Sequence, residues 1–228
     1  MEQIDWSPVR LVVFDLDGTL YDQNCLRRRM LRELGLYCLR HPTEVGLLRV
    51  IGEFRRARER LADEQASNIA QLQYERPAAS LAIRPEAVAG VVREWFEERP
   101  LRHLGCCRFA AVDQVFESLR DSGRLVGVFS DYPVRDKLRA LNLEADLVAA
   151  AVESEIDRLK PHPAGLEILM KRAGVTPVQT LMIGDREDRD GACARNAGVQ
   201  YLIKTPSPQA PNQFREFQEL LPGPVGVE

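Results

Sequence analysis

The chain has 228 residues, of which 45% are hydrophobic and 29% are charged, as is ordinary for a globular protein with one large domain or a core domain plus an insertion. The formal net charge of −3 gives no reason to expect nucleic acid or an anionic membrane as a partner. No apolar run approaches the roughly 18 residues that span a bilayer. Residues 1–7 also lack the basic start and apolar middle of a secretion signal, so we expect a cytoplasmic protein.

The cysteines suggest neither a disulfide framework nor a zinc site, because their number is odd and no Cys-x-x-Cys pair occurs. We expect all five to be reduced thiols that mostly serve as buried packing. They are Cys25, Cys38, Cys106, Cys107 and Cys193.

The first predicted element is a buried strand over the apolar run Val9 to Phe14, which stops at two carboxylates, Asp15 and Asp17. While the chain stays extended, residues two apart leave the same face of a strand. Gly18 then allows a backbone conformation that other residues resist. Like charges this close are costly unless a cation lies between them or one carboxyl is protonated. The strand end is therefore a candidate Mg²⁺ and phosphate site, with an ordinary acidic turn as the alternative.

Residues 21–104 show helical periodicity and no convincing strand. Apolar stripes at helical spacing run from Leu47 to Leu61 and from Val88 to Phe96, and a shorter helix over Ala66 to Arg76 is expected to close at Pro77. We predict an all-helical cap domain over residues 23–104, inserted after the first strand and hinged near its two ends.

The predicted cap is rich in arginine, with fifteen Arg, no Lys and twelve acidic residues between positions 21 and 104. Most of these arginines are expected on solvated helix faces with local ion pairs. The alternative is that some face a negatively charged substrate. The candidates are Arg27, Arg28, Arg29, Arg49, Arg55 and Arg56.

The α/β catalytic core is predicted to comprise residues 1–22 and 105–228, where helices and strands alternate as in a doubly wound, Rossmann-like parallel sheet. After the first strand, the expected strands are 124–129, 147–152, 180–183 and 200–203. The expected helices are 111–122, 133–141, 163–173, 188–197 and a short one at 214–221.

Polar residues recur where the apolar strands of this core end. They are Asp15 with Asp17, Ser130, the segment around Lys160, and Asp185 with the acids that follow it. Ligands of doubly wound sheets bind outside the carboxyl ends of the strands, so we expect these residues to converge.

Four segments, taken in order, resemble the motifs of the haloacid dehalogenase-like hydrolase superfamily, in its phosphatase branch with a helical cap between the first two motifs. They are Asp15 to Leu20 (DLDGTL), Ser130, Lys160-Pro161 and Gly184 to Asp190 (GDREDRD). The match covers the chain from Val9 to Ile203, with the helical insertion where many members carry a cap.

The resemblance implies a role for each motif residue. Asp15 would be the nucleophile that forms an aspartyl-phosphate. Asp17 would protonate the leaving oxygen and then activate water. Mg²⁺ would bind to Asp15, the main-chain carbonyl of Asp17 and Asp185. Ser130 and Lys160 would contact the phosphoryl group, which needs donors and positive charge.

Lys160 is one of only four lysines among thirty-one basic residues, so a solvated loop lysine at this position is the weaker interpretation. The last motif departs from the family's commonest form, because Arg189 occupies the position of the second acid. We favour Asp190 as the further metal-site carboxylate, with Asp188 as the alternative. Asp131 could support the site from behind, and the three histidines are interpreted as structural or exposed.

The sequence thus predicts a Mg²⁺-dependent phosphatase that hydrolyses a small phosphorylated metabolite through an aspartyl-phosphate. A sugar-phosphate mutase of the same superfamily is the first alternative, although such members usually carry a cap histidine where this chain has Arg27. Dehalogenase relatives lack the second aspartate, whereas Asp17 is present here. A non-catalytic binding protein on this fold is the remaining alternative. Substrate identity and oligomeric state do not follow from the sequence.

Overall fold

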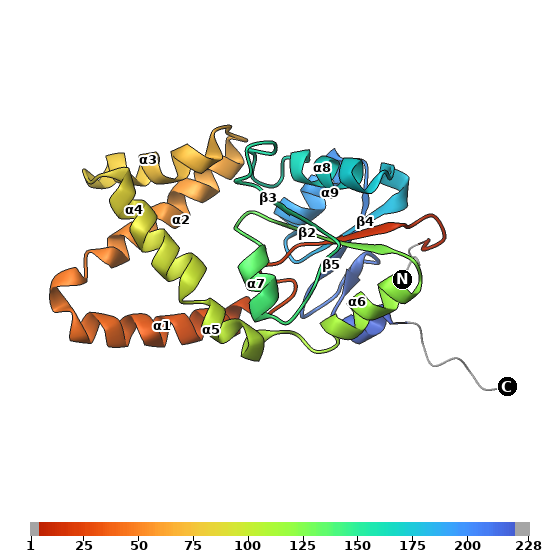
Figure 1. Cartoon of the computed structure of the whole chain (residues 1–228), viewed down its shortest axis with the longest axis horizontal. Coiled ribbons are helices and arrows are strands. Elements are labelled where there is room, and N and C mark those ends of the chain that lie inside the picture. The colour runs from red at the N-terminus through yellow and green to blue at the C-terminus, as the bar shows by residue number, and fades with distance from the viewer. Residues whose placement is uncertain (1–4, 222–228) are drawn as a thin grey trace.

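The computed structural model describes residues 5–221 and places a six-stranded parallel sheet at the centre of that part of the chain, in the order β3-β2-β1-β4-β5-β6 (Figure 1). The strands are β1 (Leu11–Phe14), β2 (Leu125–Ser130), β3 (Leu147–Ala150), β4 (Thr180–Gly184), β5 (Gln200–Lys204) and β6 (Gln213–Phe214). Strand β1 is central and pairs along its whole length with both β2 and β4. The Rossmann-like α/β fold class predicted from the sequence is confirmed.

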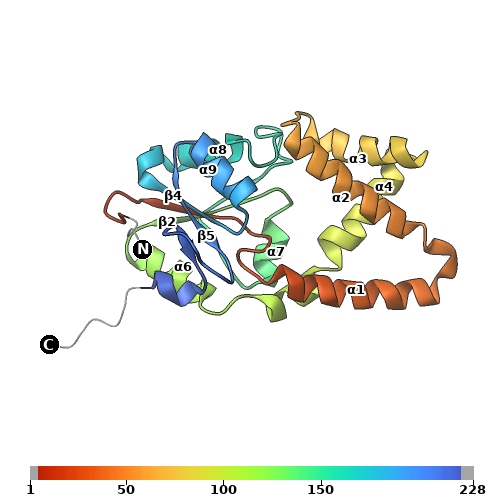
Figure 2. The same cartoon turned by 180° about the vertical axis from the view of Figure 1, so that it is seen from behind.

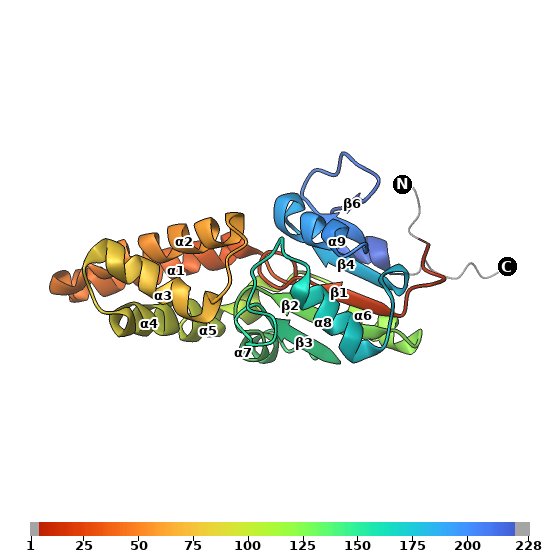
Figure 3. The ribbon, with the colours of Figure 1, turned by 90° about the horizontal axis from the view of Figure 1, so that it is seen from above.

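Both faces of the sheet are covered by helices, which explains why β1 is apolar at every position. Successive side chains of a strand point to opposite faces. Val12 and Phe14 pack with α6 (Val112–Asp121) and α7 (Arg135–Ala140), whereas Leu11 and Val13 pack with α8 (Ala164–Ala173) and α9 (Ala192–Asn196). Figure 1 shows α8 and α9 above the strands and α6 below them, and Figure 3 shows the same layers from above, with α8 in front of the sheet.

The segment between β1 and α6 forms a helical block over residues 23–104, and no strand interrupts it. Its helices are α1 (Gln23–Arg40), α2 (Leu47–Asp63), α3 (Ile69–Leu81), α4 (Pro85–Val92) and α5 (Leu101–Leu104), with a π-helical segment at Arg93–Glu98. The block lies beyond the carboxyl ends of the central strands, as Figures 1 and 2 show from opposite sides.

The helical block has a small core of its own, and this core corrects one prediction. Helix α3 does not close at Pro77 but continues through it to Leu81. Proline inside a helix removes one backbone hydrogen bond and disfavours the helix. Here Pro77 and Ala78 are both buried, and Ala78 packs with Phe54 and Val88, so burial of this face offsets the missing bond.

Two further predictions, near the carboxyl terminus, were wrong in detail. Residues 214–221 do not form one helix, because Phe214 belongs to strand β6 and only Phe217–Leu220 form a short 3-10 turn. The helix expected from Asp188 begins only at Ala192, after a π-helical turn over Glu187–Gly191. Asp190 lies in that turn, and its carboxylate accepts hydrogen bonds from the backbone N–H groups of Asp185 and Arg186, just before the turn.

The expectation that all five cysteines are reduced is also corrected, because Cys25 and Cys107 form a disulfide across 82 positions of sequence. Cys25 lies in the first turn of α1 and Cys107 shortly after α5, next to the two connections between the helical block and the sheet, where the N–H of Asp22 donates to the carbonyl of Cys107 at 2.8 Å. Their Cα atoms are 5.7 Å apart, within the range that a disulfide spans. Only the tertiary pairing of these connections makes them neighbours. Cys38, Cys106 and Cys193 are free.

No helix in the described part of the chain has the length and apolar content needed to cross a membrane.

Candidate active site

The floor of the candidate site is a cluster of three aspartates around one lysine at the ends of β1 and β4. Lys160 Nζ donates to Asp15 at 2.5 Å and to Asp190 at 2.6 Å, and all three side chains are buried. Carboxylate oxygens of Asp15, Asp185 and Asp190 lie within 4.8 Å of one another. Thr19 Oγ1 donates to the other oxygen of Asp15 at 2.9 Å and so fixes its orientation.

Backbone geometry brings the β1 loop against the β4 loop at this point. Gly18 has φ of +106°, and a Cβ placed there would lie 2.3 Å from Asp185 Oδ2. Asp190 accepts the N–H groups of Asp185 and Arg186 at 3.2 and 3.0 Å, which locks the turn after β4. The close approach of the three carboxylates is therefore set by hydrogen bonds and by the absence of a side chain at position 18.

The aspartate cluster carries more negative charge than Lys160 balances. Burial and the neighbouring Asp190 raise the pKa of Asp185 to about 6, although Lys160 opposes this. Burial, Asp190 and Asp185 likewise raise the pKa of Asp15 well above its usual range, against the lowering effect of Lys160. The ion pairs with Asp15 and Asp190 outweigh burial and raise the pKa of Lys160, which remains a cation. A divalent cation among these oxygens would relieve the repulsion.

Asp17 lies apart from the cluster and is held by three donors. Its carboxylate accepts hydrogen bonds from Ser130 Oγ at 2.9 Å, Lys137 Nζ at 2.5 Å and the Tyr21 hydroxyl at 2.5 Å. Burial raises the pKa of Asp17, but the charge of Lys137 and these hydrogen bonds outweigh burial, so the pKa is lowered overall. Asp17 and Asp15 thus differ in proton affinity, with Asp17 the stronger acid.

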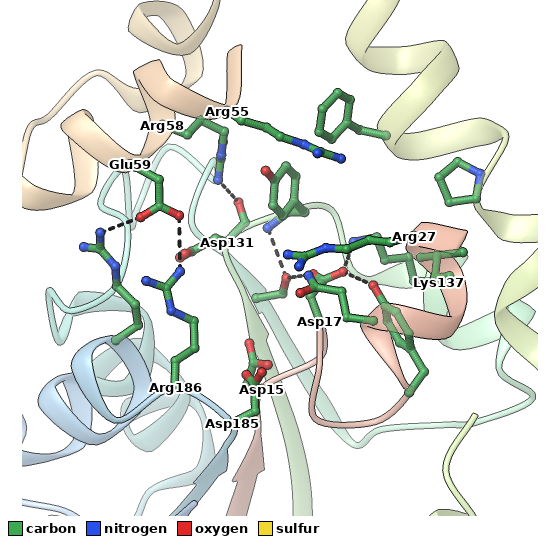
Figure 4. A pocket seen from close by; sticks show the side chains of 18 of the residues that line it. Asp15, Asp17, Arg27, Arg55, Arg58, Glu59, Asp131, Lys137, Asp185 and Arg186 are labelled. Carbon is green, nitrogen blue, oxygen red and sulfur yellow. Dashed lines mark hydrogen bonds and ion pairs between the residues drawn. The ribbon is translucent and has the colours of Figure 1, made fainter. Parts of the chain in front are cut away.

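A cavity of about 630 Å³ opens above both aspartates and is walled by the sheet edge and the helical block together (Figure 4). The core contributes polar residues: Asp15, Asp17, Ser130, Asp131, Lys137, Lys160, Asp185 and Asp190. The helical block contributes arginines and an apolar wall: Arg27, Arg55, Arg58, Leu26, Met30, Leu31, Leu34, Ile51, Trp95 and Phe96.

Ion pairs and hydrogen bonds connect α2 to the loops that form the site. Arg189, which is buried, pairs with Glu59 at 2.8 Å and with Asp63 at 2.7 Å. Arg58 donates to the main-chain carbonyl of Asp131 at 2.7 Å, and its guanidinium lies 4.2 Å from the centre of the Tyr132 ring. The helical block is thereby held over the ends of β2 and β4.

The structure brings together all six residues predicted for the site: Asp15, Asp17, Ser130, Lys160, Asp185 and Asp190. Asp188, the alternative to Asp190, is exposed and pairs with Arg186, so it lies outside the cluster. Asp131 supports the site from behind, because its carboxylate accepts the N–H of Lys160 at 3.0 Å. None of the three histidines lines the cavity.

The arginine candidates divide. All six are exposed, but only Arg27 and Arg55 line the cavity; Arg28, Arg29, Arg49 and Arg56 do not.

Sequence reasoning missed Lys137, Tyr21, Arg58 and the contacts of Arg189. A signal existed for Lys137, since it is one of four lysines in an arginine-rich chain, the same argument that favours Lys160. The departure at Arg189 was visible in the last motif, but its partners on α2 were not.

A family model for haloacid dehalogenase-like hydrolases matches residues 9–198. The chain belongs to this family. Among curated relatives, phosphoglycolate phosphatase of Shigella dysenteriae is 27% identical over 205 residues, which cover 85% of this chain and 80% of that protein. The likeness of this haloacid dehalogenase-like hydrolase to that relative thus extends over most of both chains.

Two solved structures show the shared fold. A 2-haloacid dehalogenase from Pseudomonas syringae aligns over 93% of this hydrolase and 96% of its own chain, with a TM-score of 0.64 and 21% identity. A phosphatase of the same family from Thermococcus onnurineus aligns over the same shares, with a TM-score of 0.63 and 19% identity. At these identities the likeness establishes the fold alone.

Proposed function

We propose that this hydrolase is a Mg²⁺-dependent phosphatase that cleaves a small phosphorylated metabolite through a phosphorylated Asp15. The observation that carries the proposal is that two aspartates at one strand end, the buried Asp15 and the partly buried Asp17, lie in different surroundings. Asp15 lies in the acidic cluster with Lys160, and Asp17 lies outside it among three hydrogen-bond donors. A dehalogenase needs no second carboxylate of this kind, because it has no alkoxide leaving group to protonate.

The aspartate cluster fits Mg²⁺, which prefers hard oxygen ligands and keeps several waters. Asp15, Asp185 and Asp190 offer closely spaced carboxylate oxygens, and the repulsion that raises the pKa of Asp185 is what a cation would relieve. Gly18 leaves room for Asp185 to approach. Mg²⁺ would draw charge from the phosphoryl oxygens and align the phosphorus with Asp15. The main-chain carbonyl of Asp17 is a further proposed ligand.

The reaction proposed for these residues has two steps. A carboxylate oxygen of Asp15 attacks phosphorus, the bond from phosphorus to the leaving oxygen breaks, and Asp17 gives its proton to that oxygen. Water then attacks the phosphorylated Asp15, Asp17 takes the proton of that water, and inorganic phosphate leaves. The three donors around Asp17 hold its side chain in place and stabilise its charged form between the steps. In the first step, the negative charge of a bound phosphoryl group would raise the pKa of Asp17 so that it carries the proton, and Mg²⁺ would lower the pKa of Asp15 so that it is ionised.

The cations of the site would stabilise the charge that phosphoryl transfer develops. Lys160 lies against Asp15, and Lys137 lies against Asp17, so a phosphoryl group between the aspartates would have a positive charge on each side. The helical block would act as the cap that closes over the substrate and excludes water. Two features disfavour a sugar-phosphate mutase. Arg27 occupies the position where such relatives usually carry a cap histidine, and much of the cavity wall from the helical block is apolar.

Phosphate release from a phosphomonoester in the presence of Mg²⁺ tests the proposal. Because the relative in Shigella dysenteriae is named for phosphoglycolate, 2-phosphoglycolate is the first compound to assay. Asp15→Asn should abolish turnover, whereas the matched control Asp188→Asn, which alters an exposed acid paired with Arg186, should retain it. Full activity of Asp15→Asn would refute the nucleophile, and absence of any Mg²⁺-dependent hydrolysis in the unaltered protein would refute the function.

A further inference from the structure

Two arginines of the helical block enter the cavity without an anionic partner. Arg27 on α1 and Arg55 on α2 both line it, and neither makes a hydrogen bond or an ion pair with any residue in the described part of the chain. The other three arginines of the lining are engaged. Arg58 donates to Gln73 and Asp131, while Arg186 and Arg189 pair with Glu59.

The two free guanidiniums affect each other. Burial lowers the pKa of Arg55, and the positive charge of Arg27 lowers it further, against the opposing effect of Tyr132. Two like charges that face a shared, partly desolvated space repel each other unless an anion is bound. Both side chains remain open to solvent through the cavity, so a ligand can reach them.

The two arginines reach the cavity from the helical block, whereas the groups that would hold the transferred phosphoryl group belong to the core. In Figure 4, Asp15 and Asp185 lie at one end of the cavity, Arg55 projects from the helical block at the other, and Arg27 lies between. The guanidinium of Arg55 lies 5.2 Å from the centre of the Phe96 ring, a contact that fixes its direction. The surrounding wall is apolar, with Leu26, Met30 and Trp95 in it, which strengthens electrostatic attraction at this place.

We propose that Arg27 and Arg55 form a subsite for a second anionic group on the leaving group, so that the preferred substrates are phosphomonoesters carrying a carboxylate or a second phosphate. This inference rests on the proposed phosphatase activity and adds the substrate class to it. Arginine suits both anions because its planar guanidinium can make two parallel hydrogen bonds to either. The apolar residues that the helical block adds to the cavity, Leu26, Met30 and Trp95 among them, would contact a short carbon chain that joins the two anions.

The test compares matched substrates that differ only in the second anion. The pairs are 2-phosphoglycolate with ethyl phosphate, and 4-(phosphonooxy)butanoate with butyl phosphate, each assayed with Mg²⁺ and the full chain. The unaltered protein should have a higher kcat/KM for the carboxylated member of at least one pair. Arg27→Gln and Arg55→Gln should each lower that preference by about ten- to a hundredfold, mainly through KM, as expected for the loss of a hydrogen bond to a charged group.

Arg28→Gln and Arg49→Gln are matched controls, since they remove exposed arginines of the same two helices that do not line the cavity. Both should retain the preference. Replacement by Lys at positions 27 and 55 should restore part of it, which separates lost charge from disturbed packing. Equal kcat/KM within both pairs, or a preference that survives both Gln substitutions, would overturn the subsite. No hydrolysis of any of the four compounds would instead refute the phosphatase activity on which it rests.

Discussion

Gly18→Ala is expected to lower activity by displacing Asp185, in addition to the loss of stability caused by backbone strain. Gly18 has φ of +106°, a conformation that residues with a Cβ rarely adopt, and such strain costs about 1–3 kcal/mol of unfolding free energy. For a chain of this size, each kcal/mol lowers Tm by roughly 2–4 °C. The new Cβ would also lie 2.3 Å from Asp185 Oδ2, so that carboxylate must move.

The displacement of Asp185 should appear in catalysis. A shift of about 1 Å in a positioned group costs roughly a hundredfold in rate. We expect Gly18→Ala to lose about this much kcat and to require more Mg²⁺, measured by phosphate release over a Mg²⁺ titration. Gly123→Ala is the matched control, because Gly123 has φ of +76° with no atom within 4 Å of the added Cβ. It should lose stability and keep activity. Near-normal kcat and Mg²⁺ dependence in Gly18→Ala would show that Asp185 does not need its present position.

Three more predictions concern the charges around the site. Lys137→Met removes a hydrogen-bond donor and a positive charge from beside Asp17, so kcat/KM should fall by about ten- to a hundredfold for carboxylated and alkyl phosphates alike. A loss confined to carboxylated substrates would show instead that Lys137 binds the leaving group. In the metal-free protein, Asp185 has a folded-state pKa of about 6, above its usual value, so the folded state holds an extra proton between pH 4 and 6 and loses stability as pH rises through that window. Added Mg²⁺ should therefore raise Tm more at pH 7.5 than at pH 5.5, which differential scanning calorimetry measures, and an equal shift at both values would contradict the assignment. Arg189→Gln removes the ion pairs with Glu59 and Asp63, whose side chains are 57% and 70% exposed, so the loss of unfolding free energy should not exceed about 1 kcal/mol. Hydrogen exchange in α2 should still be faster than in the control Arg56→Gln, which breaks an ion pair within α2. Unchanged exchange would show that other contacts hold the helical block.

The sequence was informative where chemistry is local. An apolar run that ends in Asp15 and Asp17 predicts both a strand and a polar end to it, and parallel pairing then brings Ser130 and Asp185 to the same edge. The choice between Asp188 and Asp190 was open in the sequence, because both follow Asp185 closely. It depends on the π-helical turn that directs Asp190 inward and leaves Asp188 exposed.

Contacts between residues far apart in the sequence could not be predicted. Lys137 lies 120 positions from Asp17, and no periodicity connects them. The disulfide of Cys25 with Cys107 depends on how the two connections of the helical block pair, and the continuation of α3 through Pro77 depends on burial against other helices. Among six candidate arginines, only the packing of α1 and α2 against the core separates Arg27 and Arg55 from the others.

The most direct test of the account is to identify the residue that carries the phosphoryl group during turnover. Enzyme quenched in acid while hydrolysing a phosphomonoester with Mg²⁺ is treated with borohydride, which reduces an aspartyl-phosphate to homoserine, and its peptides are analysed by mass spectrometry. The account predicts homoserine at position 15, and none when Mg²⁺ is omitted. Reduction at another aspartate during active turnover would contradict it.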